Sequence, residues 1–79
     1  MTSSMAYTPE PIHLYTQYVA DGLVRVVRSS GETVVESNST DFVAAALRYL
    51  KTSGAHPDTS VVILGVCGNT AFNGALKHV

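Results

Sequence analysis

The chain has 79 residues, a length that limits it to one domain with a small core. Hydrophobic residues make up 46% of it and charged residues only 14%, against about 25% in an ordinary domain. We therefore expect apolar surface to be buried against a second copy or a target. The net charge is −1, with basic and acidic residues interspersed, so the basic stripe of a nucleic-acid-binding protein is missing.

The cysteine and histidine content argues against a disulfide or a zinc site. Cys67 is alone, and its spacing from the three scattered histidines (His13, His56 and His78) fits no structural zinc motif. The sequence also lacks a signal-peptide pattern and an apolar run of the ~20 residues that would span a bilayer. We expect a cytoplasmic protein without metal, cofactor or membrane contact, in which oligomerisation compensates for the small core.

The chain begins with a segment that predicts a flexible N-terminal arm over residues 1–11. Pro9 and Pro11 are incompatible with a helix interior and disfavour strand pairing. The single domain is expected to occupy residues 12–79.

Three strands are predicted next, at residues 12–19, 23–28 and 32–37, because these runs are rich in β-branched and aromatic residues. Asp21-Gly22 and Ser29-Ser30-Gly31 provide tight turns between them, so the three strands form an antiparallel meander.

The second strand is apolar on both faces, with Val24 and Val26 on one side and Leu23 and Val27 on the other. It is either central with both faces covered, or one face meets another subunit. On the first strand, Leu14, Thr16 and Tyr18 share one face, and the other face carries Tyr15, Gln17 and Val19.

A helix is predicted after Ser39-Thr40, either of which can cap it, with Asp41 in the first turn. Gly54 ends this helix and Pro57 prevents its resumption. Apolar residues recur at spacings of three and four, namely Phe42, Val43, Ala46, Leu47 and Leu50.

A fourth strand is predicted over residues 60–66. The segment from Gly68 onwards has two readings: a short fifth strand from Thr70 to Phe72, or a short helix capped by Thr70. Gly74 disfavours a long helix, so the strand is preferred. The order predicts an α+β fold: an antiparallel sheet of four to five strands with one α-helix packed on one face.

Cys67 offers one catalytic interpretation. A nucleophile between small residues after a strand is typical of hydrolase elbows, with His56 or His78 as base and Asp58 to orient it. That elbow also requires a following helix and a larger sheet. We therefore expect no enzymatic activity, and a small buried cysteine leading into a hairpin turn.

From Asp21-Gly22 onwards the layout resembles that of small phage-encoded anti-CRISPR proteins that inhibit type I-F systems. The elements that carry the resemblance are the hairpin, an alanine-rich helix (Ala44-Ala45-Ala46), the strand Val62-Ile63-Leu64-Gly65, and then Asn69, Ala71-Phe72 and Leu76. The resemblance implies a non-enzymatic inhibitor that occupies a protein surface of a bacterial CRISPR surveillance complex.

Such an inhibitor would contact its partner, a CRISPR effector subunit, through aromatic and arginine side chains, which anchor protein interfaces. The candidates are Tyr15, Tyr18, Arg25, Arg28 and Tyr49. The four candidates on the strands, Tyr15, Tyr18, Arg25 and Arg28, would also fit base stacking, although ordinary cross-strand packing explains them as well. The sequence is also compatible with an antitoxin-like module, with a small-ligand-binding regulatory module, or with a cysteine hydrolase-like enzyme using Cys67.

Overall fold

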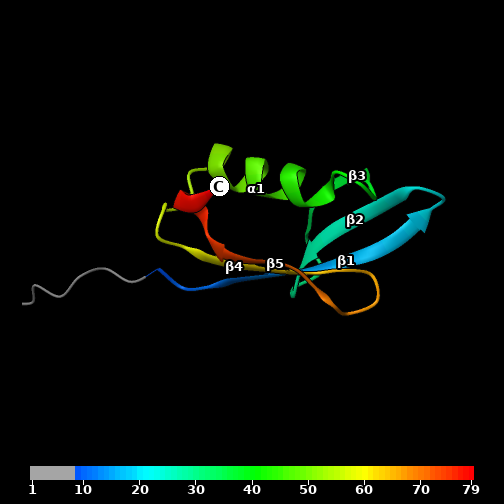
Figure 1. The fold of residues 1–79 in the computed structure, drawn as a ribbon, viewed down its shortest axis with the longest axis horizontal. Coiled ribbons are helices and arrows are strands. Elements are labelled where there is room, and N and C mark those ends of the chain that lie inside the picture. The colour runs from blue at the N-terminus through cyan, green and yellow to red at the C-terminus, as the bar shows by residue number, and fades with distance from the viewer. Residues whose placement is uncertain (1–8) are drawn as a thin grey trace, which may run out of the picture.

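The structure is a computed structural model that describes residues 9–79. Most of the predicted arm (residues 1–11) lies outside the described residues; Pro9 to Pro11 precede the first strand without regular structure. The elements in chain order are β1 (Ile12–Ala20), β2 (Leu23–Arg28), β3 (Thr33–Asn38), α1 (Phe42–Thr52), β4 (Ser60–Leu64), β5 (Thr70–Ala75) and the 3₁₀ helix η1 (Leu76–His78) (Figure 1).

The five strands form one sheet in the order β3-β2-β1-β4-β5. The α+β class, the meander and the helix on one face of the sheet are confirmed (Figure 1). One detail differs from a wholly antiparallel sheet, because β1 and β4 pair in parallel, from Ile12 opposite Val61 to Tyr15 opposite Leu64. The reason is α1, which carries the chain from β3 at one edge back to the far side of β1; such a crossover permits parallel pairing.

The start of α1 differs from the expected capping. Asp41 holds the N-cap position, and its side chain makes no capping hydrogen bond. Asn38 instead accepts hydrogen bonds from the backbone N–H and the hydroxyl of Thr40, at 3.2 and 2.9 Å. The side chain of Asn38 thus closes a local turn before the helix, so neither Ser39 nor Thr40 acts as its cap.

The end of α1 agrees with the prediction that Gly54 ends the helix. Gly54 has φ +90, and its N–H donates to the carbonyl of Lys51 at 3.2 Å. The N–H of Ala55 donates to the carbonyl of Leu50 at 3.1 Å. These two bonds are those of a Schellman motif, which needs a residue tolerant of positive φ at this position.

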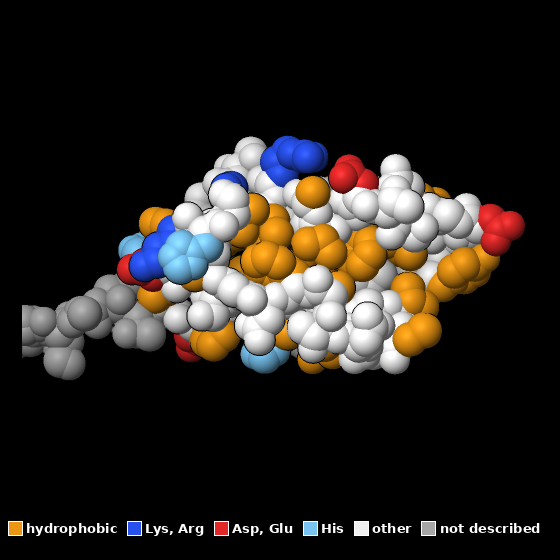
Figure 2. All heavy atoms as spheres, viewed as in Figure 1, with side chains coloured by type: hydrophobic (Ala, Val, Ile, Leu, Met, Phe, Trp, Pro, Cys, Tyr) orange, Lys and Arg blue, Asp and Glu red, His pale blue; other side chains and the backbone are white. Residues whose placement is uncertain are grey.

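The core lies between α1 and one face of the sheet. The predicted helix stripe is confirmed: Ala46, Leu47 and Leu50 are buried, and Phe42 and Val43 pack against them. The sheet and η1 contribute Leu14, Val26, Val34, Val61, Ile63 and Leu76. Figure 2 shows hydrophobic side chains gathered in a band between the helix and the strands below it.

The C-terminal segment forms the predicted fifth strand, which extends to Ala75 and continues into η1. Leu76 is buried, and its N–H donates to the carbonyl of Thr59 at 3.0 Å. The N–H of Lys77 donates to the carbonyl of Pro57 at 2.8 Å. The chain therefore ends β5 against the loop that leads into β4. No helix within residues 9–79 has the length and apolar character needed to cross a bilayer.

Candidate functional site

The sheet face opposite α1, called the open face below, carries an apolar row across three strands. Tyr15 of β1 pairs in register with Val27 of β2 and with Leu64 of β4. Directly paired residues lie on the same face of a sheet, so the three side chains are neighbours. Val27 is buried without belonging to the core under α1, whereas Tyr15 is 40% exposed. We call Val27, Tyr15 and Leu64 the apolar row.

A polar row lies beside the apolar row, two residues further along the strands. Gln17 pairs in register with Arg25, and Arg25 with Glu36 of β3. The Arg25 guanidinium contacts the Glu36 carboxylate through both Nε and Nη2, each 3.1 Å from Oε2. Both side chains remain more than a third exposed, so the pair holds the arginine in place and contributes little stability.

A hollow of about 330 Å³ opens at one end of the apolar row. Its lining comes from β1, from the end of β2 and from the turn between β2 and β3, namely Tyr15, Gln17, Val27, Arg28, Ser29 and Gly31. Arg28 is held there by Glu32, whose Oε1 lies 3.3 Å from Nε. The lining of the hollow mixes apolar and polar residues, a composition that suits a protruding side chain of a partner.

The structure separates the five predicted contact residues into groups. Tyr15 and Arg25 lie together on the open face, and Arg28 lines the adjoining hollow. Tyr18 lies near the tip of the β1–β2 hairpin, 62% exposed, and its hydroxyl donates to Oδ1 of Asp21 at 3.2 Å. Tyr49 lies on α1 and is 39% exposed. One flat partner surface therefore cannot contact all five at once.

Two residues of the open face were missed from sequence. Leu64 joins the apolar row only because β4 pairs with β1 in parallel, a long-range pairing that no local pattern reveals. The sequence predicted Glu36 in a strand, but its pairing with Arg25 across the strands was not predicted. Opposite charges on neighbouring strands are a signal that could have indicated this pair.

The prediction that Cys67 is buried is wrong, because its side chain is exposed. Strand β4 stops at Leu64, and the chain turns back through a hairpin closed by the N–H of Gly65 donating to the carbonyl of Asn69 at 2.7 Å. The hairpin part of the prediction is correct. Gly68 has φ +85 in this turn, a conformation suited to glycine.

A hydrolase centre at Cys67 would require a helix after the cysteine and a base beside it. The turn leads into β5 instead of a helix. His56 precedes β4 and His78 follows β5, so each lies at the opposite end of a strand from Cys67. A strand of 5 residues separates the two ends by roughly 16 Å, beyond the reach of these side chains.

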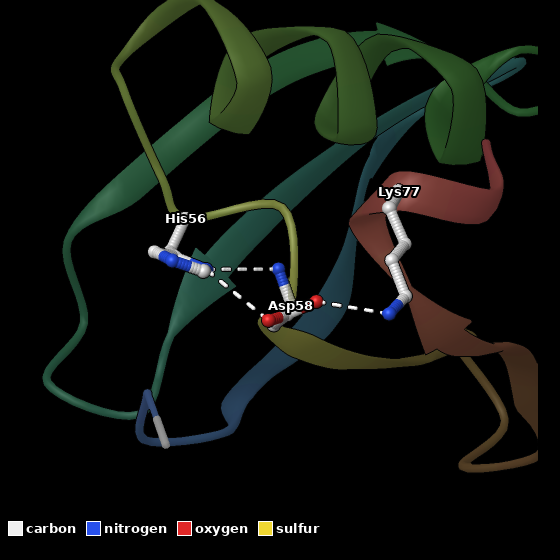
Figure 3. Close-up of polar contacts among 3 residues, drawn as sticks. All are labelled: His56, Asp58 and Lys77. Atoms are coloured by element: carbon white, nitrogen blue, oxygen red, sulfur yellow. Dashed lines mark hydrogen bonds and ion pairs between the residues drawn. The ribbon is translucent and has the colours of Figure 1, made fainter. Parts of the chain in front are cut away.

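A polar cluster joins the α1–β4 loop to η1 (Figure 3). The Lys77 ammonium lies 2.9 Å from Oδ1 of Asp58, and the backbone N–H of Asp58 donates to Nδ1 of His56 at 3.0 Å. The hydrogen bond and positive charge of Lys77 hold the pKa of Asp58 below its usual value. All three side chains are substantially exposed, and their contacts tie the loop to η1.

Residues 9–79 contain no group of three or more histidine, cysteine, aspartate or glutamate side chains placed to hold a metal ion. Comparisons of the chain with protein-family models, with curated proteins and with solved structures find no match.

Proposed function

We propose that the chain is a non-enzymatic binding protein that attaches to a protein partner through its open face. Following its resemblance to anti-CRISPR proteins, we propose that it acts in the bacterial cytoplasm as an inhibitor of a CRISPR surveillance complex, and that it is a homodimer. The partner surface is contacted first by Tyr15 and Arg25, with Arg28 at the hollow. Tyr18 and Tyr49 belong to other surfaces and are secondary candidates.

The observation that supports this proposal is the presence of an exposed tyrosine and an ion-paired arginine on the same uncovered sheet face. Tyrosine and arginine are enriched among the residues that dominate binding energy. The apolar row supplies area that loses water on contact. The Arg25–Glu36 pair restrains the guanidinium before binding, which lowers the conformational entropy lost on association.

The charges of the open face and of the adjoining hollow favour a protein over a nucleic acid. Arg25 is paired with Glu36 and Arg28 with Glu32, so each arginine has a neutralising carboxylate. Binding to a phosphate backbone depends on cations that displace counterions. A neutral, partly apolar surface instead resembles an ordinary protein interface.

The test uses two tyrosines that are matched in exposure and lie on different surfaces. Wild-type protein, Tyr15→Ala and Tyr49→Ala are titrated against a purified type I-F surveillance complex by biolayer interferometry. Tyr15 and Tyr49 are 40% and 39% exposed, so truncation removes similar solvent-accessible side chains. We expect Tyr15→Ala to weaken binding about 30-fold, as for an interface residue worth about 2 kcal/mol, and Tyr49→Ala to change it less than about 2-fold.

Two results would overturn parts of the proposal. Equal effects of both variants would reject the open face as the contact surface. No binding by the wild-type protein would reject this target, and affinity capture from a bacterial lysate with wild type and Tyr15→Ala then identifies another. A captured toxin would favour an antitoxin-like module. If neither the wild type nor Tyr15→Ala captures a protein, a ligand-binding module would be favoured.

A further inference from the structure

The sheet has two edges, β3 and β5, and only one of them is protected. An edge strand presents unpaired backbone N–H and C=O groups, which invite another strand. Proteins usually block such edges with charged residues, proline, bulges or a covering element. The two edges of this sheet differ in charge, in the element that covers them and in the position of the bulge.

Strand β3 is protected in three ways. It carries the charged residue Glu36, and its pairing with β2 is interrupted by a bulge next to Val26 and Val27. Helix α1 follows β3 directly and packs against it more closely than against any other strand. A further strand cannot pair along β3 without meeting a charge and an irregular backbone.

Strand β5 has none of these features along most of its length. The segment Thr70–Ala75 has the sequence TAFNGA, without a charged residue or a proline. Its bulge lies at its first residues, opposite Ile63 and Leu64, and the rest pairs regularly with β4. Within residues 9–79 no element of the sheet lies beyond β5. Its outer edge is therefore a regular and uncharged pairing surface.

The hydrogen bonds to β4 identify the backbone groups that point outward. The N–H of Leu76 donates to Thr59, and the ladder continues in register to Gly74 opposite Val61. In an antiparallel pair, residues alternate between those bonded to the neighbour and those pointing away from it. The backbone N–H and C=O groups of Leu76 and Gly74 therefore point towards β4. Those of Asn73 and Ala75 point away from β4, to the unpaired edge of the sheet.

We propose that β5 pairs antiparallel with β5 of a second copy of this chain, about a two-fold axis at Gly74. Asn73 of each copy then exchanges backbone hydrogen bonds with Ala75 of the other. The five strands of each copy join into one continuous sheet. The inference rests on the homodimer part of the proposed function and is independent of the partner bound at the open face.

The side chains of β5 suit a second copy at this edge. In the proposed register Gly74 faces Gly74 in a non-hydrogen-bonded pair, so no side chains oppose each other at the two-fold axis. Phe72 already lies over Gly74, since a Cβ on this glycine would be 3.3 Å from Cζ of the ring. Two identical uncharged strands meet without like-charge repulsion. The alternative is that a peptide of another protein pairs with this edge. In that case the isolated protein would be a monomer.

The test removes one outward N–H without disturbing the bonds to β4. Ala75 has φ −88 and ψ 146, close to the geometry that proline requires, so Ala75→Pro fits the monomer while deleting an edge donor. Thr33→Pro is the matched control. Its N–H points outward on β3, because the carbonyl of the preceding residue, Glu32, points inward and accepts from the N–H of Arg28. Thr33 is also the first strand residue, where proline is tolerated.

Size-exclusion chromatography with light scattering measures the molar mass of all three proteins at equal concentration. We expect the molar mass of wild type and Thr33→Pro to be twice the 8.4 kDa of one chain. We expect the molar mass of Ala75→Pro to be that of a single chain. Amide hydrogen exchange of the wild type gives a second readout that needs no variant to fold. The Asn73 and Ala75 amides should be protected in the dimer and lose at least about 10-fold of that protection on dilution to monomer.

The proposal is overturned by a wild-type protein that stays monomeric at millimolar concentration. It is also overturned by an Ala75→Pro dimer, or by a wild-type dimer whose Asn73 amide exchanges freely, since the subunits would then meet elsewhere. The two proposals fail separately. Tyr15→Ala should keep the dimer while binding the partner about 30-fold more weakly, and Ala75→Pro should still bind the partner at the open face.

Discussion

Replacing Thr16 by valine is expected to stabilise the protein. Thr16 lies on β1, opposite Val26 and on the side of the sheet that faces α1, with 8% of its surface exposed. Its hydroxyl oxygen is buried and has no hydrogen-bond partner among the described residues. Valine has nearly the same shape, and it removes the unpaired hydroxyl while keeping the β-branch that suits a strand.

The magnitude follows from the cost of burying an unpaired polar group, about 1–3 kcal/mol. Because Thr16 retains slight exposure, we take the lower end and expect the free energy of unfolding to rise by about 1 kcal/mol. For a domain of this size that corresponds to a rise in melting temperature of about 4–8 °C. Thermal and urea unfolding followed by circular dichroism, at one fixed protein concentration, measure both quantities.

Thr33→Val is the control, because Thr33 is exposed and its hydroxyl is already in water. Its effect should stay within about 0.5 kcal/mol. An unchanged or lower melting temperature for Thr16→Val would show that the hydroxyl has a partner in solution and that the assigned cost is wrong. A changed urea m value would instead indicate an altered unfolded state.

Leu50→Ala, at a fully buried helix residue, should lower the free energy of unfolding by about 2–5 kcal/mol in urea titrations, and a loss below about 1 kcal/mol would contradict the packing of α1 on the sheet. Lys77→Ala should destabilise the protein at pH 7. The lowered pKa of Asp58 gives stability that is present above the unfolded-state pKa and lost as pH falls through the folded-state pKa. Wild type and Lys77→Ala should therefore converge in acid, and a gap that persists at low pH would refute this linkage. Cys67 should react fully with Ellman's reagent in the folded protein, whereas a rate that rises only on denaturation would contradict its exposure.

The elements that follow from local pattern were predictable. The spacing of apolar residues in 42–50 predicts a helix, and the structure has one there. Gly54 predicts the end of this helix, and the Schellman hydrogen bonds at Gly54 confirm it. The strands were found within a few residues because β-branched runs lie between turn signals. Alternation on β1 also placed Leu14 and Tyr15 on opposite faces, and the structure buries the first and leaves the second exposed.

Features that depend on distant pairing were not predictable. The parallel register of β1 with β4 joins Ile12 to Val61, and nothing in either segment specifies the other. Without that register, the apolar row could not be completed by Leu64. The burial of Cys67 was misjudged because the apolar run continues past the end of the strand. Beyond Leu64 the chain leaves the sheet, and an apolar sequence then no longer indicates burial.

The central position of β1 has a consequence for how the chain folds. β1 is synthesised first among the five strands, and it forms its second ladder only with β4. One side of β1 therefore lacks a neighbour until β4 is available. The meander β1–β2–β3 closes through short turns, whereas joining residue 12 to residue 61 closes a long loop and costs more chain entropy. Docking of the β4–β5 hairpin onto β1 is therefore expected to limit the folding rate. Substitutions that weaken the β1–β4 ladder should then slow folding more than equally destabilising ones in the β2–β3 turn.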